Sequence, residues 1–142
     1  MQSKGDSSAP IPEKIPVNPD GVTLYERIGP DGIERLVQSF YGKARYEPVL
    51  EPVFSAHVED WPEHIANITQ FWFRMTGGPS KWAGGMGRHF FLNLEGAHFQ
   101  AWLRVWEENC RELLPDREAS EMTAFAQNIG RDLEAMIQRR AR

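Results

Sequence analysis

Residues 31–41 read DGIERLVQSFY, and their apolar side chains recur three or four positions apart. An α-helix has about 3.6 residues per turn, so this spacing predicts an amphipathic helix that buries one face. The buried stripe comprises Ile33, Leu36, Val37, Phe40 and Tyr41. Asp31 precedes the stripe and is expected to cap the helix, because its carboxylate can accept from free N–H groups of the first turn.

The same spacing predicts the remaining helices. A short helix is expected over residues 23–29, and long helices are expected to begin near residue 59 or 60, near residue 93 or 95, and after Pro115. Glycine and proline at 29–30 and 77–79 end two of them. The proline-rich segment 48–54 is expected to form a compact corner, and residues 80–93 a glycine-rich loop. No segment shows the alternation of apolar and polar residues that is typical of a β-strand. The predicted fold is therefore all-α with four main helices.

Composition limits the class of protein. The chain has 142 residues, is 41% hydrophobic and carries a net charge of −4, which indicates one globular domain and argues against nucleic-acid binding. Its one cysteine excludes an intramolecular disulfide framework. Residues 1–21 hold four of the ten prolines and are predicted to be a disordered extension before a domain over residues 22–142. No apolar run reaches the roughly 20 residues of a membrane span, and no signal peptide is recognised, so we expect a cytoplasmic protein.

Polar side chains interrupt the apolar stripes. Tyr41, His64 and Trp102 lie on otherwise apolar helix faces, and His89 lies in the loop beside Phe90 and Phe91. Buried tyrosine, histidine and tryptophan each need a hydrogen-bond partner or a ligand. A flat, mostly apolar cofactor that bears a metal would satisfy all of them, and haem is the obvious candidate.

Four segments together resemble the truncated haemoglobins in order and spacing. They are GIERLVQSFY (32–41), EPVLEPVF (47–54), DWPEHIANITQFW (60–72) and RHFFLNLEGAHFQAWLRVWEE (88–108). The resemblance covers residues 23–114 and is strongest to group III, whereas the Gly-Gly-Pro triplet at 77–79 is similar to group II. It implies a truncated globin-like, two-over-two helical sandwich around haem b.

The resemblance also implies roles for single residues. His89 matches the proximal histidine that binds the iron, and the distal ligand-binding positions match Tyr41, His64 and Trp102. The positions expected to contact the cofactor are Phe54, Phe71, Trp72 and Phe91, with Lys81 and Arg88 as partners for the haem propionates by their proximity to His89. The implied ligands are O₂, CO, NO, cyanide and peroxide, and the implied function is oxygen binding or transport.

Other interpretations stay open at this point. A polar distal pocket could support NO-dioxygenase or peroxidase-like turnover, which would need a separate reductase because the chain has no flavin or nicotinamide motif. The chain could also be a cofactor-free helical interaction module or a haem-based sensor. Single residues have structural interpretations too: His89 as a loop residue, Tyr41 and Trp102 as core, and His64 facing solvent. His57 and His98 are assigned to structure, and Cys110 to the buried core.

Overall fold

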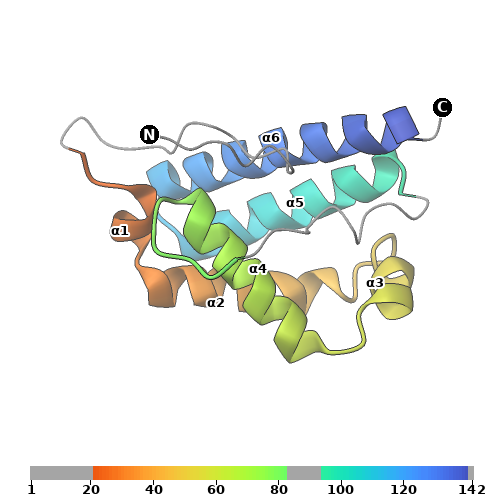
Figure 1. Ribbon diagram of the computed structural model, residues 1–142, viewed down its shortest axis with the longest axis horizontal. Coiled ribbons are helices and arrows are strands. Elements are labelled where there is room, and N and C mark those ends of the chain that lie inside the picture. Colours follow the sequence, from red (N-terminus) through yellow and green to blue (C-terminus); the bar gives the residue numbers. More distant parts are fainter. Residues whose placement is uncertain (1–20, 83–93, 141–142) are drawn as a thin grey trace.

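The computed structural model describes residues 21–82 and 94–140, and every regular element in these ranges is a helix (Figure 1). The helices are α1 (Leu24–Ile28), α2 (Pro30–Ala44), α3 (Glu51–His57), α4 (Trp61–Met75), α5 (Gly96–Leu113) and α6 (Asp116–Arg140). The predicted all-α fold is therefore confirmed. Residues 1–20 of the predicted extension and 83–93 of the predicted loop lie outside the described residues. Among the helices described, none combines the length and the hydropathy needed to traverse a bilayer.

Local capping explains where two helices begin. Thr23 caps α1, since its side chain accepts from the Glu26 N–H and the Glu26 side chain accepts from the Thr23 N–H. Asp60 caps α4 by accepting from the Glu63 N–H at 3.1 Å. Pro62 stands in the first turn of α4, where the helix needs no donor from it. The predicted start of α4 near residue 59 or 60 is confirmed, because Asp60 is its capping residue and Trp61 its first helical residue.

Two details of the sequence interpretation are wrong. Asp31 does not cap α2, because the helix already begins at Pro30, and Gly29 is the capping residue with a φ of 87°. Proline is favoured at a first helical position, and glycine accepts the positive φ without strain, so this pair starts the helix two residues earlier than predicted. The predicted corner also contains α3, a helix of seven residues whose first turn includes Pro52.

The helices form two layers. In Figure 1, α2 and α4 cross in one layer, and α5 and α6 lie side by side in the other. The chain reverses direction between α2 and α4 and again between α5 and α6, and α2 also packs directly on α5. A bond from the Tyr25 N–H to the Thr76 carbonyl, 2.9 Å long, ties the start of α1 to the end of α4.

Aromatic side chains join the layers at the centre. Trp106 of α5 stacks on Trp72 of α4, with ring centroids 4.7 Å apart, and meets Phe40 of α2 edge-on at 5.1 Å. Its indole N–H donates to the Met122 carbonyl of α6 at 3.2 Å, so its one polar group is satisfied. Asn109 adds a hydrogen bond between α5 and α2, because its buried amide donates to the Leu36 carbonyl at 2.9 Å. These contacts fix the separation of α2 and α5, which determines the space left beside them.

Candidate functional site

A tyrosine and a histidine meet where α2 passes the start of α4. The Tyr41 hydroxyl lies 3.2 Å from Nε2 of His64, although the two residues are 23 positions apart in sequence. Tyr41 is 5% exposed, and burial raises its pKa well above the ordinary value for a phenol. The phenol therefore keeps its proton at any physiological pH and can donate one hydrogen bond while accepting another.

An aromatic shell surrounds this pair. The Tyr41 ring meets Phe54 edge-on, with centroids 5.7 Å apart, and lies 5.6 Å from the ring of Trp61. The Arg45 guanidinium lies over the Trp61 ring, 4.2 Å from the ring centroid, within the range of a cation–π interaction. The phenol is therefore held by packing from several elements, and its hydroxyl has a defined direction.

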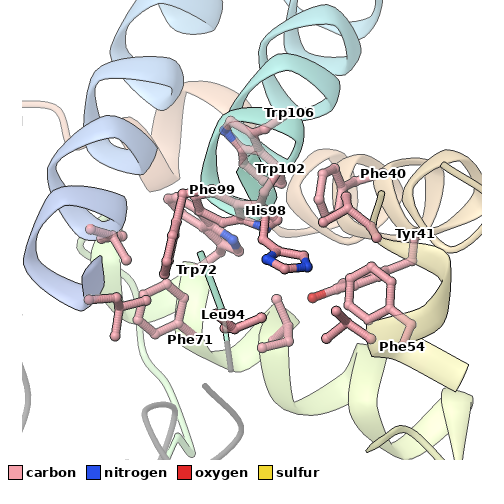
Figure 2. A pocket seen from close by; sticks show the side chains of 15 residues that line it. Phe40, Tyr41, Phe54, Phe71, Trp72, Leu94, His98, Phe99, Trp102 and Trp106 are labelled. Carbon is pink, nitrogen blue, oxygen red and sulfur yellow. The ribbon is translucent and has the colours of Figure 1, made fainter. Parts of the chain in front are cut away.

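A largely apolar pocket opens beside Tyr41. Figure 2 shows side chains from both helical layers converging on it. The space between these side chains has an empty volume of about 710 Å³, part of which is open to solvent. The lining residues are Phe40, Tyr41, Leu50, Val53, Phe54, Ile68, Phe71, Trp72, Leu94, His98, Phe99, Trp102, Trp106, Ile129 and Leu133.

The structure brings together several of the residues singled out in the sequence. Tyr41, Phe54, Phe71, Trp72 and Trp102 all line this one pocket. Phe71 and Trp72 are buried and pack edge-on against each other at 5.3 Å. Trp102 is half-buried and stacks over Trp106 with centroids 6.4 Å apart. Aromatic residues of four helices, α2, α3, α4 and α5, thus line one cavity.

The other predicted residues lie elsewhere. His64 is not among the lining residues; it contacts the pocket through Tyr41. Lys81 is exposed and outside the lining, with its backbone N–H donating to the Gln70 side chain at 2.8 Å. Its role as a partner for a haem propionate stays a prediction. Arg88, His89 and Phe91 lie outside the described residues.

One pocket residue was assigned differently from the sequence. His98, which the sequence interpretation placed among the structural residues, lines the pocket, and Figure 2 shows its imidazole reaching into it. Its position four residues before Trp102 could have revealed this, since residues four apart share one face of a helix. Leu94, which also lines the pocket, had received no role.

The pocket has the chemistry that haem requires. Its wall is mostly aliphatic and aromatic carbon, and a few polar groups converge on it, chiefly the Tyr41 phenol and the His98 imidazole. A porphyrin has apolar faces and a polar centre and rim, so flat aromatic walls with isolated donors suit it.

Comparison with known proteins gives an independent result. A family model described as bacterial-like globin matches residues 23–131. The group 3 truncated hemoglobin ctb of Campylobacter jejuni is 28% identical over 119 residues, which cover 80% of this chain and 94% of the relative.

Solved structures agree on the fold. The group III truncated hemoglobin from Campylobacter jejuni superposes with a TM-score of 0.72 at 26% identity, over 78% of this chain and 91% of that one. The truncated oxygen-avid haemoglobin from Bacillus subtilis gives 0.67 at 23% identity, over 78% and 98% of the two chains. The 2/2 hemoglobin from Synechococcus sp. PCC 7002, in the cyanomet state with covalently attached heme, gives 0.69 at 20% identity, over 80% and 99%. The predicted two-over-two arrangement is thereby confirmed.

Proposed function

Because this chain belongs to the bacterial-like truncated globin family, we propose that it binds haem b in the pocket beside Tyr41 and holds O₂ or another diatomic ligand there. The observation that carries the proposal is the Tyr41–His64 pair, 3.2 Å apart, at the edge of an aromatic pocket. Bound haem supplies an iron with one face open to a small ligand. The protein supplies the walls, the axial imidazole and the polar groups near that ligand.

Residues of the described structure are suited to hold the porphyrin. Phe54, Phe71 and Trp72 present aromatic surface to the pocket from α3 and α4. Burying such a ring against them removes a large apolar area from water, which is the main source of affinity for a flat cofactor. The axial ligand that we propose is His89, on the family resemblance of its flanking sequence.

Tyr41 is the proposed donor to the bound ligand. O₂ on ferrous iron gains electron density, so its oxygens are good acceptors for a phenolic O–H. The direction of that proton depends on His64. When the neutral imidazole carries its proton on Nε2, it donates to the Tyr41 oxygen and leaves the phenol proton for the pocket. In the other tautomer the phenol donates to His64 instead, and the pocket loses this donor.

The hydrogen-bond donors of the pocket are expected to stabilise different diatomic ligands to different degrees. A hydrogen-bond donor stabilises O₂, whose bound form is partly anionic, more than CO, whose bound form accepts weakly. We therefore propose that the pocket favours O₂ over CO, while NO and cyanide also fit an open iron position. NO or peroxide turnover would require electrons from a separate donor.

Absorption spectroscopy of the full chain tests the proposal. The purified protein is titrated with haemin, reduced and exposed to CO, and we expect an intense Soret band that shifts on reduction and again on CO binding. The variant His89→Ala is expected to lose most of its haem affinity. The matched control is His57→Ala, which removes an exposed imidazole on α3 and should bind haem as the parent does.

Two outcomes would contradict the proposal. A folded, helical protein that leaves haemin unbound at micromolar concentrations would favour a cofactor-free interaction module. Full haem loading of His89→Ala, with the parent spectrum, would assign the axial position to another side chain.

A further inference from the structure

His98 occupies a position in the pocket that structural capping alone does not explain. It is the third residue of α5, is half-buried, and lines the same cavity as Tyr41 of α2 (Figure 2). The other polar hydrogens of the lining belong to tryptophan indoles, and that of Trp106 already donates to Met122. Tyr41 and His98 thus border one pocket from the two helical layers.

A backbone hydrogen bond sets the tautomer of this histidine. The Glu95 N–H donates to Nδ1 of His98 at 2.9 Å, so Nδ1 must carry a lone pair. The neutral ring therefore has its proton on Nε2, the nitrogen farther from the backbone. No acceptor for this Nε2–H is found among residues 21–82 and 94–140.

This tautomer excludes one role and favours another. A nitrogen that carries a proton cannot coordinate iron, so His98 is not an axial ligand while the Glu95 bond stands. This N–H borders the pocket, so a cofactor that fills the pocket and excludes water must offer it an acceptor. Haem would offer acceptors in two places: the carboxylates at its rim and a ligand bound at its iron. Its pyrrole nitrogens are not available as acceptors, because their lone pairs bind the iron.

We propose that His98 is a hydrogen-bond donor to its guest, giving its Nε2–H to an anionic oxygen that is either a haem carboxylate or an iron-bound ligand. The inference rests on the proposed function, because it requires haem in this pocket. It adds a second donor, on α5, to the Tyr41 hydroxyl on α2.

Two substitutions separate this role from capping. In His98→Asn, the side-chain oxygen stands close to the place of Nδ1 and can still accept from Glu95, but the Nε2–H is lost. In His98→Gln, the terminal amide can place an N–H near the position of Nε2, and its oxygen can reach back to the Glu95 N–H as that of Glu26 does to Thr23 on α1. Because both variants keep an acceptor for the Glu95 N–H, a purely structural role predicts parent-like behaviour from both. A donor role predicts a defect in the asparagine variant and rescue in the glutamine variant.

Each full-length variant is titrated with haemin and with haemin dimethyl ester, and O₂ dissociation is measured on the haemin form. A hydrogen bond to a charged acceptor corresponds to about a tenfold to hundredfold effect. If the acceptor is a carboxylate, His98→Asn weakens haemin binding by that factor but leaves ester binding unchanged. If it is the ligand, haemin affinity stays and O₂ dissociates faster by that factor.

The outcomes that overturn the inference are distinct from failure of the proposed function. Parent-like haemin affinity and O₂ dissociation in His98→Asn would refute the donor role and leave the haem site intact. An equal defect in His98→Asn and His98→Gln, without rescue by the glutamine amide, would also refute the donor role. If the parent chain itself binds no haemin, the proposed function fails first, and this inference fails with it.

Discussion

Replacing Tyr41 with phenylalanine isolates one hydroxyl in the proposed ligand site. The ring that remains keeps its edge-on contacts with Phe40, at 4.9 Å, and with Phe54, at 5.7 Å. Because the two side chains have nearly the same volume, the substitution opens no cavity and leaves the aromatic shell packed. What disappears is the bond to His64 at 3.2 Å and the proton available to a ligand.

The size of the effect follows from these two bonds. The bond to His64 is between neutral groups and contributes about 0.5–1.5 kcal/mol to stability. His64 is half-exposed and can bond to water instead, so we expect a loss near the lower end. A bond from the phenol to partly anionic O₂ contributes about 1.5–3 kcal/mol, which corresponds to roughly tenfold to 150-fold faster O₂ dissociation. The effect on the ligand should therefore exceed the effect on folding.

Stopped-flow replacement of O₂ by CO measures the dissociation rate directly. The matched control is Tyr46→Phe, which deletes the hydroxyl of a tyrosine that is 70% exposed and outside the pocket. We expect the control to dissociate O₂ at the parent rate. A haem-loaded, stably folded Tyr41→Phe whose rate stays within about twofold of the parent would refute the role of the phenol as donor.

Two further predictions concern stability. Burial raises the pKa of the Cys110 thiol from 9.0 to about 12, so the folded state holds this proton more tightly, and the resulting stability is present below pH 9 and is lost as the pH rises toward 12. Urea unfolding should show that the stability of Cys110→Ala declines less between pH 9 and 12 than that of the parent. Equal declines in the two proteins would contradict a contribution from the Cys110 thiol. Gly78→Ala should lower the free energy of unfolding by about 1–3 kcal/mol, because its Cβ would stand 2.3 Å from the Tyr25 ring, whereas Gly42→Ala meets nothing within 4 Å and should be neutral or stabilising. Equal midpoints for the two glycine variants in thermal unfolding would show that the Tyr25 ring moves aside without a loss of stability.

Helix positions were largely predictable because they depend on neighbours in sequence. Asp60 and Pro62 mark the start of α4 through local hydrogen bonds and a fixed φ, and both signals are visible in the sequence. The same kind of signal gave a wrong prediction at α3, because Pro52 was interpreted as a residue that interrupts the chain rather than as part of a helix. Proline breaks a helix only in its interior, and here it occupies the first turn, so the outcome depended on one or two residues of register.

The candidate site was predictable only in part. The aromatic residues and Tyr41 follow from apolar periodicity and from the family resemblance, since a core-facing stripe must meet something apolar. Lys81 was placed by its distance in sequence from His89, and its role as a propionate partner stays a prediction. His98 was missed because a single histidine near a helix start can face the solvent or the interior with equal local cost.

The sequence by itself determined the helical fold class, most helix limits and membership of the family, because each depends on short-range geometry or on the order of residues. Only the tertiary structure decided that Tyr41 and His64 stand 3.2 Å apart and that His98 enters the same cavity from α5. Those facts depend on how α2 crosses α4 and rests on α5, which is fixed by the interlocked side chains of Trp72, Trp106 and Asn109. Periodicity identifies the buried face of each helix, but close packing selects the partner that each buried side chain meets.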